Sequence, residues 1–146
     1  MNAEIIGTYD VIVREDKNIE EILGYAKFDV PELPSISFSS DRFPHIEGGK
    51  ATIKRISLFS FMSKPSFVDV VSEINKQGCR LASPWDLVCL TYEKKDLQKE
   101  LNLVSLGEIH SVVCGFVRGR HISIYSTQKI IKNSRDYVFL GVKSIN

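Results

Sequence analysis

Apolar and polar side chains alternate near the N-terminus, where residues 4–14 read EIIGTYDVIVR. Tyr9, Val11 and Val13 share one parity, and a period of two is typical of a β-strand with one buried face. The next segment, residues 18–25, spaces its apolar side chains as a helix does, but a glycine limits it to about two turns. The pattern therefore predicts a strand followed by a short helix or a turn.

A second strand is predicted over residues 50–62, KATIKRISLFSFM, directly after the turn signal Gly48-Gly49. Its alternation is imperfect because Ile53 and Ile56 fall on opposite faces. Such a pattern indicates an inner strand that is covered on both sides, or a strand with a β-bulge.

Helical periodicity is clearest in residues 64–78, where one apolar stripe recurs at i, i+3, i+4 and i+7: Phe67, Val70, Val71 and Ile74. Pro65 and Ser66 supply a start for this helix. Gly78 can take the left-handed conformation that commonly ends a helix.

The stretch CRLASPWDLVCLT predicts the start of a second helix rather than an active site. Ser83 is a favourable N-cap, Pro84 suits the first helical position, and Asp86 can complete a capping box. Trp85 and Cys89 then lie on a helix that is apolar over much of its circumference. We therefore expect both in the core, with the indole N–H of Trp85 reaching a partner at the surface.

Strand-like segments occupy the last third of the chain, over residues 103–113, 115–125 and 137–145. A tight turn at Gly119-Arg120 would join two strands into a hairpin, although the strands could instead join through Gly115. The order of elements predicts an α+β fold, with a mainly antiparallel sheet and two or three helices packed on it. Residues 1–146 are expected to form one globular domain.

Residues 29–50 differ from the rest of the chain, because they hold three prolines and show little helical periodicity. We expect a long irregular loop in this region. Loops of this length are usually functional or mobile, so this one is the first candidate for a binding surface.

The composition is that of a globular protein, with 43% hydrophobic, 25% charged and 10% aromatic residues. A formal net charge of +1 gives no global field that could hold a polyanion such as DNA. No apolar run approaches the roughly 20 residues that span a bilayer, and the N-terminal segment lacks signal-peptide features. Three well-separated cysteines without a C-x-x-C pair fit a reducing compartment. The sequence therefore predicts a cytoplasmic protein.

The second half of the chain resembles a group of small bacterial proteins of uncharacterised function. The resemblance rests on the helix end at Gly78, R-L-A-S at 80–83, L-V-S-L-G at 103–107, R-H-I at 120–122 and F-L-G-V-K at 139–143. Leu81 stands where that pattern has proline, and Gly141 where it has alanine. More distantly, the G-x-R-L helix start and the terminal strand are similar to segments of C-type-lectin-like folds. Neither resemblance implies an activity, because a fold does not determine function.

His110 and Cys114 are the residues that most suggest a nucleophile or a metal site. Both fall in a predicted strand, where residues four apart stand about 13 Å from each other, so a structural role is the favoured interpretation. The glycine pairs lack the spacing of phosphate-binding loops, and no paired-cysteine or H-E-x-x-H spacing is present. The sequence predicts no catalytic residue, no metal site and no cofactor.

Two polar segments remain as candidate binding surfaces. The first is the long loop, with Asp41, Arg42, His45 and Glu47. The second is the predicted hairpin, with Arg118, Arg120 and His121. The loop residues could also supply acid and base groups, and the hairpin charges could simply blunt the edge of a sheet. Binding is the favoured role for the loop, whereas blunting of the edge is favoured for the hairpin.

The leading hypothesis is a small binding domain that recognises another protein through these two surfaces, without catalysis and without a membrane role. One alternative is binding of nucleic acid or an anionic ligand by the basic last third of the chain. Another is a hydrolase or transferase that uses Cys114 or His45, which predicts a reactive thiol of low pKa or a convergent pocket.

Overall fold

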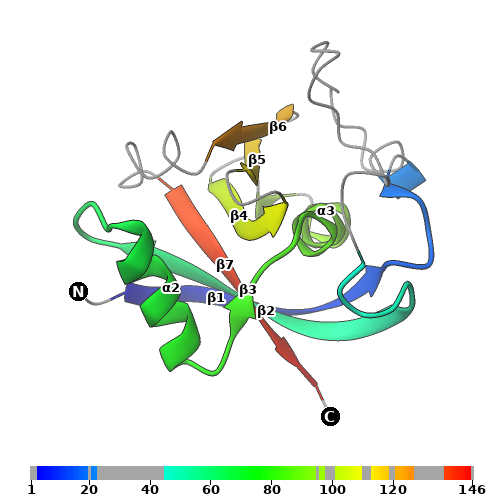
Figure 1. The fold of residues 1–146 in the computed structure, drawn as a ribbon, viewed down its shortest axis with the longest axis horizontal. Helices are drawn as coiled ribbons and strands as arrows, with labels where there is room; N and C mark the ends of the chain where they lie inside the picture. The colour runs from blue at the N-terminus through cyan, green and yellow to red at the C-terminus, as the bar shows by residue number, and fades with distance from the viewer. Residues whose placement is uncertain are drawn as a thin grey trace.

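The computed structural model describes residues 3–19, 21–22, 45–94, 96–97, 101–109, 113–118, 121–126 and 137–145, with the backbone alone between 108 and 126. Its elements are β1 (Ala3–Arg14), β2 (Ala51–Phe61), α2 (Phe67–Lys76), β3 (Arg80–Leu81), α3 (Pro84–Glu93), β4 (Asn102–Ile109), β5 (Val113–Arg118), β6 (His121–Ser126) and β7 (Tyr137–Ser144). Figure 1 shows them with these labels.

The described strands form one sheet in the order β1-β2-β7-β4-β5-β6, and the two-residue strand β3 also pairs with β7. All of these pairs are antiparallel except β4 with β7, which run parallel. The register of β1 against β2 shifts between Ile5 and Gly7, as a β-bulge requires. The prediction of an α+β fold with a mainly antiparallel sheet is confirmed.

The sheet is covered on both faces along β2. Ile56 and Leu58 pack in one apolar core with α3, whereas Phe59 and Phe61 pack in a second core with α2. Because successive side chains of a strand point to opposite faces, the two helices lie on opposite faces of the sheet. The second half of β2 is therefore an inner strand covered on both sides, one of the two predicted alternatives, but this does not account for Ile53, which is 57% exposed.

The helix α3 is the centre of the larger core. It contacts β1, β4 and β5, and the sheet curls around it in Figure 1, where the helix is seen nearly end-on. Each residue from Pro84 to Thr91 is buried, which explains why this helix is apolar around most of its circumference. Burial of Trp85 or Leu90 stabilises the fold by roughly 1.5–3 kcal/mol each.

Both helices begin where the sequence predicts, and each start is capped by a serine. Ser66 and Asp69 form a capping box at α2, and Ser83 and Asp86 form one at α3. Gly78 has φ = +76°, the left-handed conformation expected after α2. Cys89 is buried as predicted, and so is Trp85. No part of the Trp85 side chain is exposed.

Two predictions for the last third of the chain need correction. The strand predicted over residues 103–113 is present as β4, but its predicted end is wrong, because β4 ends at Ile109 and pairs there with Val113 of β5, so the chain reverses between them. His110 and Cys114 therefore do not share one strand, and the distance argument between them fails. The alternative turn at Gly115 is also wrong, since Gly115 lies inside β5. Arg118 and His121 are cross-strand partners, as the predicted turn between them requires.

Two further expectations concern the first half of the chain, namely a short helical turn and a long loop. Ile19, Glu21 and Ile22 begin the expected helical turn, in which the N–H groups of Glu21 and Ile22 donate to Asn18 O. Residues 29–44 of the expected loop lie outside the described residues.

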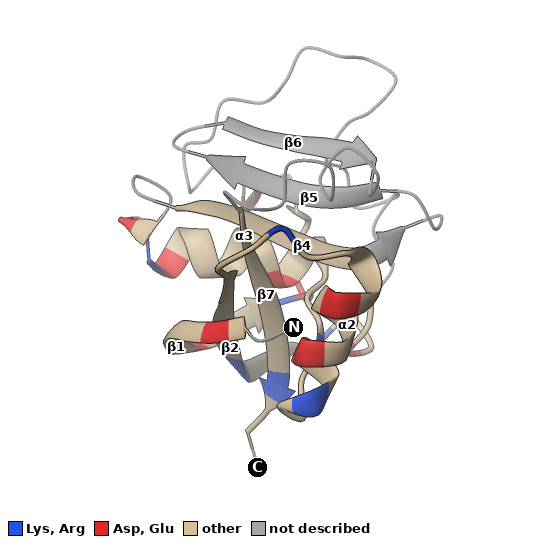
Figure 2. Ribbon diagram, turned by 90° about the vertical axis from the view of Figure 1, so that its left-hand side faces the viewer, with Lys and Arg blue, Asp and Glu red and all other residues tan. Residues whose placement is uncertain are grey.

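Figure 2 shows acidic positions along α2 and a basic one at its end, the order that stabilises a helix dipole. No described helix has the length and apolar character needed to cross a membrane.

Candidate functional site

The end of the predicted long loop, residues His45–Lys50, is held from inside by one buried carboxylate, and we call this segment the anchored loop. Glu15 follows β1 and is only 2% exposed. Its two oxygens accept the N–H groups of Ile46 at 3.1 Å, Glu47 at 3.0 Å and Gly49 at 3.3 Å. A buried carboxylate is tolerated only when it is well hydrogen-bonded, so these contacts fix both Glu15 and the loop backbone.

The two glycines of the anchored loop allow this geometry. Gly48 and Gly49 have φ values of +69° and +74°, which side chains with a Cβ rarely adopt. A Cβ at Gly49 would lie 3.0 Å from Nδ1 of His45. The predicted turn signal at Gly48-Gly49 is therefore confirmed, and the loop closes tightly over it.

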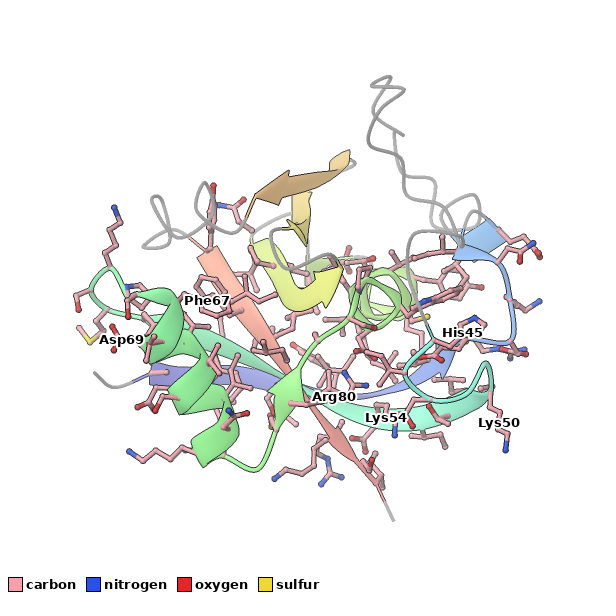
Figure 3. The ribbon with its side chains drawn as sticks, in the orientation of Figure 1. His45, Lys50, Lys54, Phe67, Asp69 and Arg80 are labelled. Atoms are coloured by element: carbon pink, nitrogen blue, oxygen red, sulfur yellow. The ribbon has the colours of Figure 1, made fainter. Side chains whose placement is uncertain are left out.

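The outward side of the anchored loop carries three exposed side chains, His45, Ile46 and Lys50. The His45 ring lies 5.4 Å from the Trp85 ring, at an angle of 54°, so it covers the buried tryptophan from outside. Ile46 is 48% exposed, which is high for an isoleucine. Figure 3 shows Lys50 pointing away from the rest of the molecule. A histidine, an isoleucine and a lysine thus face solvent from a fixed backbone.

The inward side of the anchored loop carries Glu47, which is at the centre of an ion-pair network. Its Oε1 lies 3.0 Å from Nζ of Lys54 and 3.5 Å from NH2 of Arg80. The hydrogen bond from Lys54, together with the charges of Lys54 and Arg80, lowers the pKa of Glu47 although its partial burial opposes this. Lys54 also donates to Oγ of Ser144 at 3.0 Å, which gives this buried ammonium a second hydrogen-bond partner. Figure 3 shows Lys54 and Arg80 beside the loop.

Arg80 extends this network to the start of α3. Its NH1 donates to Oδ2 of Asp86 at 2.8 Å, and the same oxygen accepts the N–H of Ser83 at 2.7 Å. Asp86 is fully buried, so the guanidinium compensates a carboxylate that would otherwise be costly there. Asp86 Oδ1 has no hydrogen-bond partner in the described part of the chain, and Arg80 Nη2 has there only its ion pair with Glu47. The anchored loop, β3 and α3 are therefore joined by charges as well as by packing.

The thiols of the described residues are poor nucleophiles. Burial raises the pKa of Cys89 to about 12 and also raises the pKa of Cys79. Reactive cysteines have lowered pKa values, so neither thiol fits catalysis. Cys114 lies in β5, but its side chain is outside the described residues. Within the described ranges, no three residues among His, Cys, Asp and Glu are grouped as a metal site would need.

The structure places the predicted site residues in two regions. His45 and Glu47 lie together in the anchored loop, facing outward and inward, respectively. Arg118 and His121 pair between β5 and β6, at the other end of the strand order from β1. Asp41, Arg42 and Arg120 lie outside the described residues.

Sequence reasoning missed the three residues that hold the anchored loop, which are Glu15, Lys54 and Arg80. Lys54 did carry a signal, because it shares its parity with the apolar residues Ile56 and Leu58 on β2. A lysine on the buried face of a strand requires a carboxylate partner. No comparable pattern marks Glu15, which stands among polar residues at the end of β1.

Comparison with known proteins does not assign the chain to a group. No protein-family model matches the sequence, and neither the curated proteins nor the solved structures include a significant match.

Proposed function

We propose that this chain is a small binding domain that recognises another protein without catalysing a reaction on it, and that the anchored loop forms part of the contact surface. The observation that carries this proposal is the set of three backbone hydrogen bonds to Glu15. A loop that is already fixed loses little conformational entropy when a partner binds it, so more of the contact energy appears as affinity.

The outward side chains suit this role. Ile46 offers an apolar contact at the centre of the loop, with His45 beside it and Lys50 at the rim. Protein interfaces commonly have an apolar centre surrounded by polar groups. The inward carboxylate of Glu47 is already neutralised by Lys54 and Arg80, so partner recognition falls to the outward side chains.

The absence of catalysis is part of the proposal and has two supports among the described residues. The buried thiols of Cys79 and Cys89 have raised pKa values, so they are protonated at neutral pH. The lowered pKa of Glu47 keeps this carboxylate ionised and paired, which makes it a poor proton donor near neutral pH.

Site-specific photo-crosslinking tests this proposal. A photoreactive amino acid would replace Ile46 in one variant and Met62 in another, in cells of the organism that makes the protein. Met62 is a matched control because it is 88% exposed but lies beyond the other end of β2. We expect a discrete heavier adduct from position 46 that is absent from position 62.

A second pair of variants makes the test independent of probe chemistry. Without a photoreactive residue, Ile46→Asp should no longer co-purify with the partner that the crosslinking identifies. Ile53→Asp should still co-purify with it, because Ile53 is similarly exposed on β2 but lies outside the loop. Thermal unfolding of both variants would establish that they are folded. Equal adducts from positions 46 and 62, or unchanged co-purification of Ile46→Asp, would contradict the proposal.

A further inference from the structure

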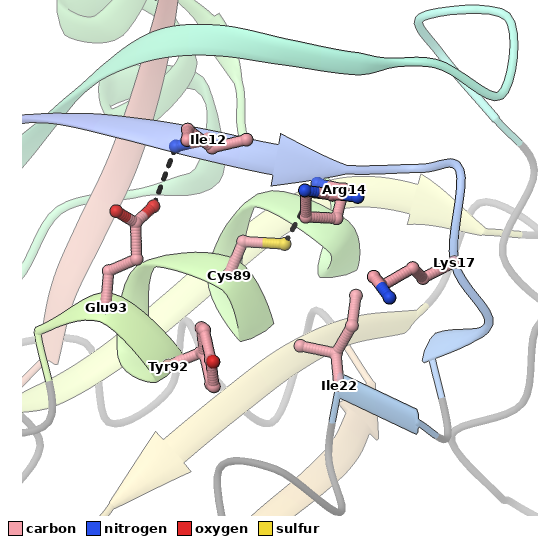
Figure 4. Close-up of a pocket in the computed structure, with 7 residues that line it drawn as sticks. All are labelled: Ile12, Arg14, Lys17, Ile22, Cys89, Tyr92 and Glu93. Carbon is pink, nitrogen blue, oxygen red and sulfur yellow. Dashed lines mark hydrogen bonds between the residues drawn. The ribbon is translucent and has the colours of Figure 1, made fainter.

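The strand β1 ends the described strand order, so only one of its two edges pairs with a neighbouring strand, β2. The helix α3 covers part of the other edge. The N–H of Ile12 donates to Oε2 of Glu93 at 2.7 Å, and the N–H of Arg14 donates to Sγ of Cys89 at 3.3 Å. Figure 4 shows both bonds at the border of a cavity of about 320 Å³ beside α3. The helix therefore closes this edge of β1 from Ile12 onward.

The rest of this edge, from Ala3 to Asp10, is open, and we call it the open edge. Backbone N–H groups of alternate residues on a strand point to the same edge, and the register against β2 continues without a shift beyond Gly7. The amides of Thr8 and Asp10 therefore point outward, as the amide of Ile12 does. Within the described ranges, neither amide has a hydrogen-bond partner on that side. These two residues thus present unpaired backbone groups at the edge of a sheet.

The side chains along the open edge favour contact with a partner. Ile5 and Ile6 are exposed by 41% and 43%. Edges that are protected from pairing usually carry charged residues, especially Lys, whereas an exposed apolar edge invites another strand. Asp10 is paired with Arg55 at 2.9 Å. Glu4 is exposed and has no ion pair in the described part of the chain, so the open edge combines an apolar stretch with one uncompensated negative charge.

A hollow of about 230 Å³ lies where the open edge meets the end of α3. It is lined by Tyr9 of β1 and by Glu93, Lys94, Asp96 and Leu97. Tyr9 and Leu97 pack against the larger core, and the Lys94 ammonium lies 5.8 Å from the centre of the Tyr9 ring. A strand added to β1 would place alternate side chains on this face of the sheet. The hollow has room for one such side chain, with apolar contact from Tyr9 and Leu97.

We propose that the open edge binds an extended segment of another protein, which joins the sheet as a further strand and pairs through its backbone with Thr8 and Asp10. In this mode, backbone hydrogen bonds supply affinity and side-chain pockets supply specificity. The segment carries apolar residues at alternate positions and a basic residue that pairs with Glu4. A second copy of β1 fits less well, because residues 3–10 contain two acidic residues and no basic one. This interaction goes beyond recognition by the anchored loop and uses none of its side chains.

Hydrogen exchange of the full, uniformly ¹⁵N-labelled chain tests the backbone pairing, with the capped peptide acetyl-KVTVTVK-amide as the probe. In the free chain, the amides of Thr8 and Asp10 should exchange much faster than those of Tyr9 and Val11, which face β2. Peptide at ten times its Kd should slow exchange at Thr8 and Asp10 about tenfold. The same peptide N-methylated at every residue keeps its side chains but has no amide donors, so it should not bind.

Two sets of variants test the side chains. Ile5→Lys should weaken peptide binding, because it places a positive charge on the edge that the basic peptide approaches. The matched control Ile53→Lys should leave binding unchanged, because Ile53 is exposed on β2, which is not an edge strand. Glu4→Lys should weaken binding of this peptide roughly two- to fivefold and strengthen binding of acetyl-EVTVTVE-amide by a similar factor. The amide spectrum of each variant reports whether it is folded.

Four results would each overturn the proposal. The first is slow exchange of the Thr8 and Asp10 amides in the free chain, and the second is exchange at these amides that the peptide does not change. The third is equal binding of the N-methylated peptide. The fourth is concentration-dependent dimerisation of the chain alone that protects the same two amides, which would assign the open edge to a second copy.

Discussion

Replacing Glu15 tests directly how the anchored loop is held. The Glu15 carboxylate uses both oxygens, since Oε1 accepts the amides of Glu47 and Gly49 and Oε2 accepts the amide of Ile46. Glu15→Gln has almost the same shape but only one acceptor oxygen. If that oxygen keeps the two bonds of Oε1, the amide NH2 group faces the Ile46 N–H and loses that bond.

The expected loss of stability follows from the number of hydrogen bonds that each variant loses. A hydrogen bond to a charged group contributes roughly 1.5–3 kcal/mol, so the loss of one bond and of the charge should destabilise Glu15→Gln by about 2 kcal/mol. For a chain of this length, that cost corresponds to a decrease in Tm of roughly 4–8 °C. Glu15→Ala loses all three bonds and should cost about 3–4 kcal/mol, less than three full bonds because the freed loop can turn its amides to water.

Urea unfolding would measure both free energies, and amide hydrogen exchange would locate the effect. We expect faster exchange at Ile46, Glu47 and Gly49 in both variants, with little change in β2. Glu4→Gln is the matched control, because Glu4 is an exposed glutamate on β1, the strand that Glu15 follows. The reasoning is refuted if Glu15→Gln is as stable as Glu4→Gln, or if the three loop amides already exchange at the rate of unprotected amides in the unaltered chain.

Three other expectations concern the network behind the loop and the buried thiols. Asp86→Ala should destabilise the fold by about 3–5 kcal/mol, because it removes part of the cap of α3 and leaves Arg80 without its Asp86 partner. Asp86→Asn should cost less, and equal urea midpoints for the two variants would contradict this. The pKa of Glu47 is lowered by folding, so its contribution to stability is present above the unfolded pKa of about 4.3 and is lost as the pH falls through the folded value. The free-energy difference between the unaltered chain and Glu47→Gln should therefore shrink in acid, and a constant difference from about pH 6 to about pH 3 would count against the pairing. Cys89 should react with iodoacetamide only as the chain unfolds in urea, as followed by peptide mass spectrometry, and rapid labelling of the native protein would contradict its raised pKa.

The helices were predictable from sequence because their signals are local. Ser83 and Asp86 fall three residues apart, and the capping box that they predict is present. Ser66 was predicted only as a helix start, and it forms a second capping box with Asp69 at the same spacing. The reversal between β4 and β5 was missed because the segment from Ile109 to Val113 contains neither glycine nor proline. Its β-branched residues continue the strand pattern through the turn, so local propensity favoured one long strand.

The pairing of the strands was not predictable for a different physical reason. β4 runs parallel to β7, which lies more than twenty residues further along the chain, and β7 also pairs with β2 and β3. No local pattern specifies which distant strand becomes a neighbour. The fold class followed from the order of elements, whereas the strand order did not.

The candidate site was predictable only in part, for the same reason. His45 and Glu47 stood out as polar residues near a glycine pair, but their spacing did not show that one faces outward and the other inward. That division depends on Lys54 from β2 and Arg80 from β3, which approach Glu47 only after the sheet has formed. A buried lysine was the single available hint, because an ammonium on an apolar strand face requires a partner.

The end of β1 borders two features of the molecule, the anchored loop and the cavity beside α3. Glu15 holds the anchored loop, while the amides of the nearby residues Ile12 and Arg14 border the cavity beside α3. A change in this short segment therefore disturbs both features through the backbone, even when only one side chain is altered. A substitution at Glu15 therefore tests the integrity of the support that the loop and the cavity share.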